Sequence, residues 1–150
     1  MGAATPSGKA NHMADAYRIE QAEKPAWSVI GPAIDVHNQQ QAGDDHARPL
    51  CFLMHDAADE VVGGAIGVTY WDWLHVNLMW VEEALRGQGY GSRLLAALED
   101  AARGQGATKA FLDTFSFQAP EFYQRHGYEV FGELREFPPG HRRYFMEKTL

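Results

Sequence analysis

The chain has 150 residues, of which 45% are hydrophobic and 12% aromatic, a composition typical of one globular domain with a real core. Its net charge is −7 and no basic run is longer than Arg142-Arg143, which argues against nonspecific nucleic-acid binding. No apolar run approaches the roughly 18 residues of a membrane span, and the start lacks a secretory pattern, so a cytoplasmic location is expected.

The first part of the chain predicts a tail, a strand and a helical region. Residues 1–12 are small, polar and aperiodic, so we expect an expression-vector remnant or a native flexible tail there, and one domain over residues 13–150. Residues 17–22 alternate enough to predict a short strand. Apolar residues at three- and four-residue spacing over residues 26–41 predict an amphipathic helix, or two short helices broken at Gly31-Pro32.

Two apolar runs, residues 50–55 and 61–70, flank a polar stretch and predict a β-hairpin. Cys51 has apolar neighbours in the first run, so we expect a buried, structural side chain and not a nucleophile. As the single cysteine, it excludes an internal disulfide. The second run contains glycines that predict a bulge or a close backbone approach, namely Gly63, Gly64 and Gly67.

The remaining pattern is a strand–helix–strand unit followed by shorter elements. Residues 74–81 predict a strand, and residues 91–103 predict a helix that ends at Gly104 and Gly106. Because residues 109–117 predict the next strand, this crossover makes the two strands parallel neighbours. A short helix and the last two strands are expected over residues 119–126, 128–134 and 142–147.

A glycine-rich segment, Arg86-Gly87-Gln88-Gly89-Tyr90-Gly91, lies between the predicted strand and helix. Glycines let the backbone approach a ligand and turn its N–H groups toward one point, and a helix N-terminus adds positive potential. Together they suit a phosphate or pyrophosphate, with Ser92 and Arg86 as further donors. No Gly-Lys-Ser/Thr follows, so a P-loop does not fit, and the glycine spacing fits a dinucleotide fold poorly. A plain strand-to-helix turn stays open as the alternative.

This segment resembles the acyl-CoA-binding signature of the GNAT superfamily, Gln/Arg-x-x-Gly-x-Gly/Ala, on Arg86, Gly89 and Gly91. Residues 78–81 resemble the family strand whose backbone pairs with the pantetheine arm. Residues 122–128 resemble the family segment Phe-Tyr-x-x-x-Gly-Phe/Tyr.

The resemblance covers about residues 17–150 and implies an α+β, GNAT-like fold. It implies a central, mostly antiparallel twisted sheet of six or seven strands, a parallel pair at the cofactor site and about four helices. The implied activity is transfer of the acetyl group of acetyl-CoA to a primary amine of a small molecule or peptide, by direct attack in a ternary complex. A non-catalytic acyl-CoA-binding sensor is the alternative. Relatives with this architecture are often dimers, so a homodimer is an open expectation.

The resemblance also implies roles for individual residues. It makes Tyr123 the acid that protonates the departing thiolate, and Ser116 stands where many members carry an asparagine. The residues implied to contact the cofactor are Met79, Trp80, Val81, Arg86, Gly87, Gln88, Gly89, Tyr90, Gly91, Ser92, Ser116 and Tyr123.

The general base is less defined. His75 and Asn77 share one face of a strand by the period of two, and histidine titrates near neutrality, so both enter the candidate catalytic set. Asp72 and Glu82 are further candidates, while a histidine without chemistry and a relay through water stay open.

Aromatic and polar side chains suggest where an acceptor binds. The aromatic residues around this strand are either core or a wall for an apolar or cationic substrate; they are Tyr70, Trp71, Trp73 and Trp80. The polar residues 37–40 are expected to touch substrate through the resemblance. The histidines lack the spacing of metal ligands, so no metal is expected.

Overall fold

The computed structural model describes residues 17–150, so the tail expected at residues 1–12 lies outside the described residues. The chain divides into two units, Met1–Gln41 and Ala42–Leu150, and each is described by itself. Within residues 17–150, no helix has the length and apolar character needed to cross a membrane.

Among its described residues the first unit contains one helix, α1 (Trp27–Ala42), and two expectations for this region are wrong. Residues 17–22 form no strand, because their tyrosine and isoleucine are 89% and 100% exposed and no described segment pairs with them. The helix is also not broken at Gly31-Pro32. Pro32 lies in its second turn, so it removes one hydrogen bond close to the helix start and the helix continues.

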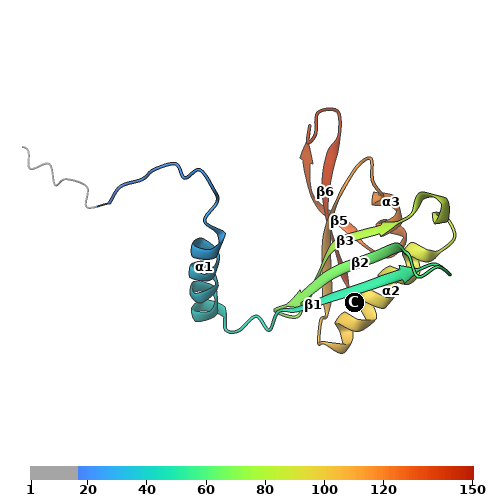
Figure 1. Ribbon diagram of the computed structural model, residues 1–150, viewed down its shortest axis with the longest axis horizontal. Coiled ribbons are helices and arrows are strands. Elements are labelled where there is room, and N and C mark those ends of the chain that lie inside the picture. Colours follow the sequence, from blue (N-terminus) through green and yellow to red (C-terminus); the bar gives the residue numbers. More distant parts are fainter. Residues whose placement is uncertain (1–16) are drawn as a thin grey trace, which may run out of the picture. The chain divides into compact units, whose positions relative to one another are not determined.

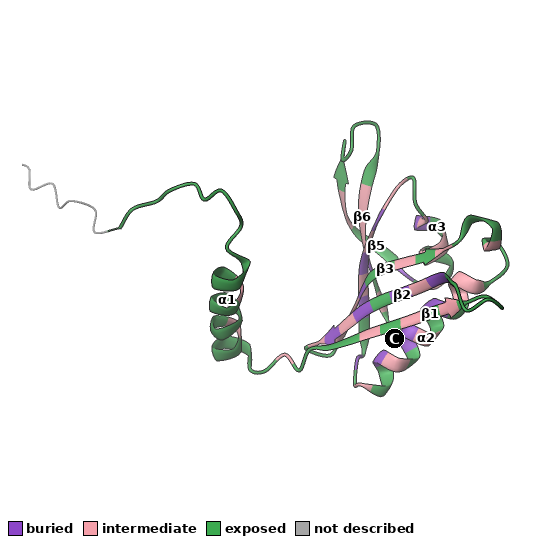
Figure 2. Cartoon of the chain, viewed as in Figure 1, coloured by how far each residue is buried: buried purple, intermediate pink, exposed green. Residues whose placement is uncertain are grey.

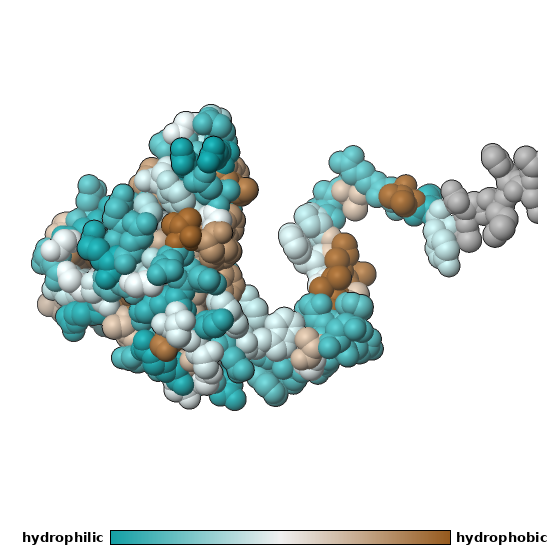
Figure 3. Space-filling view, turned by 180° about the vertical axis from the view of Figure 1, so that it is seen from behind, coloured by the Kyte–Doolittle hydropathy of each residue, from teal (hydrophilic) through white to brown (hydrophobic). Residues whose placement is uncertain are grey.

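None of the residues of α1 is buried, although many are apolar. Figure 3 shows them as brown surface on this helix. Because none of these side chains is buried, burial of apolar surface does not stabilise α1 within its own unit. A 16-residue helix is marginal alone in water. The exposed apolar residues of the helix are Trp27, Val29, Ile30, Ile34 and Val36.

The second unit is built on one six-stranded sheet in the order β1-β2-β3-β4-β6-β5 (Figure 1). All neighbours are antiparallel except β3 and β4, which the crossover helix α2 (Tyr90–Gly104) joins in parallel. This confirms the expected fold, with three α-helices over residues 17–150, α1 included, instead of about four. The strands are β1 (Arg48–His55), β2 (Val61–Tyr70), β3 (Trp73–Val81), β4 (Lys109–Phe115), β5 (Glu129–Arg135) and β6 (Arg142–Thr149). The remaining elements are a 3₁₀ turn (Glu83–Leu85) and α3 (Pro120–Arg125).

The core lies between α2 and one face of the sheet, where Figure 2 shows the buried residues in purple. Leucines at helical spacing put one side of α2 against the strands, as the sequence predicts. Removing this apolar surface from water is the main stabilising contribution of the unit. The side chains that are less than 2% exposed include Leu74, Leu95, Leu98, Leu112 and Met146.

Cys51 is exposed, which corrects the expectation that it is buried. Side chains of β1 alternate, and Leu50 and Phe52 on either side of Cys51 are the ones that pack against the core. Because successive residues of a strand face opposite sides, the apolar neighbours of Cys51 place it on the outer face.

Candidate functional site

The expected bulge is present, at the Ile66/Gly67 step of β2. Ile66 pairs with Leu78 and Gly67 pairs with Val76, so Asn77 of β3 is the extra residue. A Cβ on Gly67 would lie 2.8 Å from the carbonyl oxygen of residue 75, so the close backbone approach is present as well.

The bulge reverses which side chains of β3 face the core. Before it, Val76 is buried; after it, Met79 and Val81 pack against the core. Leu78 and Trp80 consequently point the other way and are 67% and 50% exposed. If the period of two continued unbroken from Val76, Leu78 and Trp80 would face the core and Met79 and Val81 would face away from it.

β3 and β4 are paired only over their first three residues, from the Trp73–Lys109 pair to the His75–Phe111 pair. Both strands continue, to Val81 and Phe115, without further pairing between them. The part of β3 after the bulge therefore has no strand partner on its β4 side among the described residues. An extended ligand can bind such a free edge through backbone hydrogen bonds.

The glycine loop follows β3 and ends at α2. Across the part of the chain that the structure describes, the backbone N–H groups of residues 87–92 find no protein acceptor, whereas those of Arg86 and Arg93 on either side do. Gly89 caps the helix in the left-handed region, at φ 85°, and supplies no side chain to the first turn. A row of unpaired N–H groups at the positive end of a helix is suited to an anion.

Two side chains brace this loop. The Arg86 Nε donates to the carbonyl oxygen of Val81 at 3.0 Å, and the Gln88 Nε2 donates to that of Ala84 at 3.1 Å. These contacts tie the loop to the end of β3 and to the 3₁₀ turn, so the N–H groups are held in place before any ligand binds.

Replacing Gly89 with alanine should lower the free energy of unfolding by about 1–2 kcal/mol, because its backbone is left-handed. A Cβ there would meet nothing within 4 Å, so the effect isolates backbone strain from crowding. Urea unfolding measures it. Gly104→Ala is the matched control, since that position is also open but has no positive φ, and helix propensity there favours alanine. Equal destabilisation by both variants would contradict the argument.

Tyr123 lies on α3 and is half-buried, with its ring against those of Phe122 and Tyr128. Burial raises the pKa of its hydroxyl, and the negative charge of Asp113 raises it further. Tyr123 therefore stays protonated at neutral pH and can donate a hydrogen bond or a proton.

His75 and Asn77 are brought together, as their shared face predicts. The Asn77 Nδ2 donates to the His75 Nδ1 at 3.1 Å, and the imidazole stacks on Phe111 with the ring centroids 4.4 Å apart. Burial lowers the pKa of His75, and the charge of Asp113 opposes this in part. His75 is thus mainly neutral at pH 7, with its hydrogen on Nε2.

The other candidate bases flank β3 at its two ends. Asp72 is in the β2–β3 turn, at the opposite end of the strand from the glycine loop, and Glu82 is exposed directly after the strand. Among the described residues, neither carboxylate forms a hydrogen bond or an ion pair with His75 or Tyr123, and the charge that acts on both is that of Asp113.

The sequence did not single out Asp113, whose charge acts on both Tyr123 and His75. Its Oδ2 accepts from Arg143 Nε at 2.7 Å and Nη2 at 2.6 Å. The guanidinium of Arg143 lies over the rings of Phe115, Phe137 and Phe145. The sequence does contain a signal for Asp113: it is a carboxylate in the middle of an apolar strand, where a charged side chain is rare unless it is paired.

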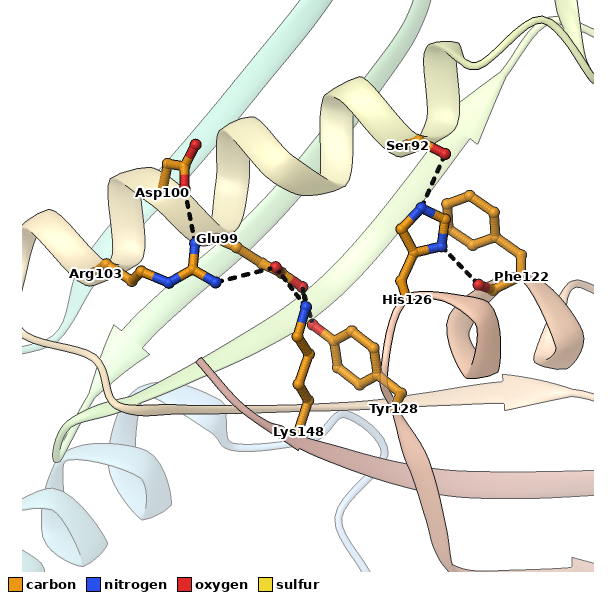
Figure 4. Close-up of polar contacts among 8 residues, drawn as sticks. All are labelled: Ser92, Glu99, Asp100, Arg103, Phe122, His126, Tyr128 and Lys148. Atoms are coloured by element: carbon orange, nitrogen blue, oxygen red, sulfur yellow. Dashed lines mark hydrogen bonds and ion pairs between the residues drawn. The ribbon is translucent and has the colours of Figure 1, made fainter.

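The remaining expected site residues have local partners. Ser116 Oγ accepts from the N–H of Arg142 at 3.1 Å and fixes the start of β6. Ser92 Oγ lies 2.9 Å from His126 Nε2 (Figure 4). Tyr70 and Trp73 pack edge-on against Phe111, the ring on which His75 stacks. These two of the four aromatic residues therefore belong to a cluster around His75 and not to the core. Residues 37–40 belong to α1.

Within residues 17–150, no three His, Cys, Asp or Glu side chains are grouped to hold a metal ion. What the geometry offers instead is a loop suited to an anion, a free strand edge and a half-buried hydroxyl donor.

Known proteins resemble this chain in sequence and in fold. Residues 13–128 match the model of the family described as "Acetyltransferase (GNAT) family". Blasticidin-S acetyltransferase of Streptomyces morookaense is 44% identical over 108 residues, 69% of this chain and 79% of that protein. An acetyltransferase from Bacillus cereus has a solved structure with a TM-score of 0.82 and 33% identity, covering 89% of this chain and 98% of that one. An aminoglycoside 6'-N-acetyltransferase solved with coenzyme A has a TM-score of 0.60 at 21% identity, covering 67% and 72%, and supports the fold.

Proposed function

This chain belongs to the GNAT acetyltransferase family and is an acyltransferase, and from that premise we propose that it acetylates a primary amine of a small molecule, using acetyl-CoA in a ternary complex. The observation that carries the proposal is the row of backbone N–H groups over residues 87–92, which have no protein acceptor among residues 17–150. It begins a few residues after the unpaired edge of β3, so a pyrophosphate and its extended arm have adjacent binding surfaces.

In this proposal the loop holds the pyrophosphate through its backbone, because side chains at Gly87 and Gly89 are absent and nothing lies within 4 Å of where a Cβ would be. The backbone of Met79, Trp80 and Val81 pairs with the pantetheine arm. When bound, acetyl-CoA supplies the activated acyl group as a thioester. Ser116 remains a proposed contact.

The chemistry proposed for the protein's residues is proton transfer around one substitution. The neutral amine nitrogen forms a bond to the thioester carbon, and the bond from that carbon to sulfur breaks. Tyr123 gives its proton to the departing thiolate, and the proton lost by the amine goes to His75 or to a water molecule. Asn77 holds the imidazole of His75 in one tautomer.

The acceptor is tested first with blasticidin S, because the blasticidin-S acetyltransferase is 44% identical over 108 residues. The assay follows free thiol released from acetyl-CoA, across that antibiotic, aminoglycosides, amino acids, polyamines and peptides. Thiol release that depends on one of the small amines is the expected result. Release with peptides alone would overturn the small-molecule part, and binding of acetyl-CoA without release for any amine would overturn the proposed reaction.

Replacing His75 with glutamine should remove the acid limb of the pH–rate profile. In the wild type, the rate with a weakly basic amine should rise with pH and level off above the pKa of His75, which burial keeps below 6.5. At pH 7 the variant should be about 10²-fold slower, the low end for a lost general base. His55→Gln, at the exposed end of β1, is the control. A pH–rate profile of His75→Gln that matches the wild type would mean that water, and not His75, takes the proton lost by the amine.

A further inference from the structure

The hydrogen-bond directions around His126 are determined by its partners. The Nδ1 lies 2.7 Å from the carbonyl oxygen of Phe122, and a carbonyl oxygen only accepts. Nδ1 must therefore carry a hydrogen. In the neutral imidazole this leaves the lone pair on Nε2, which lies 2.9 Å from the Oγ of Ser92, so the Ser92 hydroxyl is the donor (Figure 4).

This arrangement leaves the Ser92 hydroxyl unsuited to a phosphate. Ser92 lies in the first turn of α2, beside the N–H groups that have no protein acceptor. Its single hydroxyl hydrogen is already used by neutral His126, so the oxygen presents only lone pairs to an anion. If Nε2 is protonated, it donates to Ser92 Oγ instead, and the hydroxyl hydrogen becomes available to a phosphate oxygen.

We propose that His126 is a positioning residue for the cofactor phosphates: binding of CoA takes up one proton onto Nε2, which reverses the hydrogen bond to Ser92 and turns that hydroxyl toward the phosphate. The proposal rests on the proposed function, because it assumes that the glycine loop holds the pyrophosphate. The proton comes from solvent, no covalent bond between heavy atoms changes, and the positive charge on the imidazole faces the anion that it helps to bind.

The packing between α3 and α2 keeps this link in place. The Phe122 ring lies 3.4 Å from where a Cβ on Gly91 would be, and its centroid is 4.4 Å from that of His126. His126 itself is partly buried.

The elements packed around His126 carry charged groups of both signs. They include Arg93 on α2, Glu121 and Arg125 on α3, and Lys148 on β6, whose Nζ is already paired with Glu99 of α2 at 2.8 Å. An incoming phosphate adds the negative charge that an imidazolium at His126 would face.

Calorimetric titration of the whole protein with CoA tests the proposal, from pH 6 to 8.5 in two buffers of different ionisation enthalpy. The variants are Ser92→Ala, His126→Ala and the double variant. The wild type should take up more protons per CoA than Ser92→Ala, the difference approaching one. Its affinity should exceed that of Ser92→Ala about tenfold at pH 6, and the two should converge by pH 8.5. CoA phosphates bind protons themselves, and Ser92→Ala corrects for that background.

His126→Ala gives the readout that a merely structural role would not produce. With Ser92 freed, this variant should bind CoA at least as tightly as the wild type at pH 8.5 but more weakly at pH 6. The double variant should match Ser92→Ala. Lower affinity of His126→Ala at every pH, or equal proton uptake by the wild type and Ser92→Ala, would overturn the inference while leaving the proposed function intact. Absence of CoA binding to the wild type at any pH would instead overturn the proposed function.

Discussion

Tyr123→Phe is expected to lower kcat for amine-dependent thiol release by about 10²–10⁴-fold, the usual contribution of a positioned proton donor. The phenyl ring keeps the packing against Phe122 and Tyr128, so only the hydroxyl is lost. Affinity for CoA should stay within about twofold, since an interaction made only in the transition state changes kcat and not binding. Steady-state kinetics and calorimetric titration measure the two quantities.

The pH dependence sharpens this prediction. Burial and the charge of Asp113 raise the pKa of Tyr123 above its ordinary value, so the wild type keeps its proton donor at neutral pH. The alkaline limb of its rate should therefore lie at higher pH than an ordinary tyrosine would give. Tyr144→Phe is the matched control, because Tyr144 is a half-buried tyrosine that packs against the core from β6. If Tyr123→Phe retained the wild-type kcat, the thiolate would leave without this acid.

Local sequence patterns were enough to predict most of the second unit. The glycine loop and the periodicity of α2 depend on neighbours in the chain, so both the strand–loop–helix order and the parallel pair followed from residues 74–117. The bulge was expected from the glycines of β2, but the extra residue lies on the partner strand, at Asn77. Which strand carries the extra residue is decided by pairing, which a single run of sequence does not contain.

The features that were missed depend on contacts between distant residues. The partners in the Asp113–Arg143 and Ser92–His126 contacts are 30 and 34 residues apart, and each pair comes from two different elements. Cys51 was misplaced because a continuous apolar run does not say which alternate residues face the core. Residues 17–22 show that alternation alone makes no strand without a partner.

A buried carboxylate on α2 should have the largest effect on stability. Glu99 is 5% exposed and accepts from the Tyr128 hydroxyl at 2.9 Å and from Lys148 Nζ at 2.8 and 3.0 Å (Figure 4). Among the described residues, every buried side-chain polar atom has a partner, so this cluster is complete. Burial and the carboxylate of Glu99 also raise the pKa of Tyr128 strongly, which keeps its hydroxyl a donor.

Glu99→Ala removes the shared acceptor and leaves the Lys148 ammonium and the Tyr128 hydroxyl without it, in a site that is largely closed to water. Breaking a buried ion pair by removing one partner costs about 3–5 kcal/mol, so we expect a loss of that size in the free energy of unfolding, measured in urea. Asp100→Ala is the control: the adjacent, exposed carboxylate contacts Arg103 at 2.7 Å, and exposed pairs contribute at most about 1 kcal/mol. Similar losses for the two variants would mean that Lys148 and Tyr128 regain water when Glu99 is removed, and that the cluster is not closed.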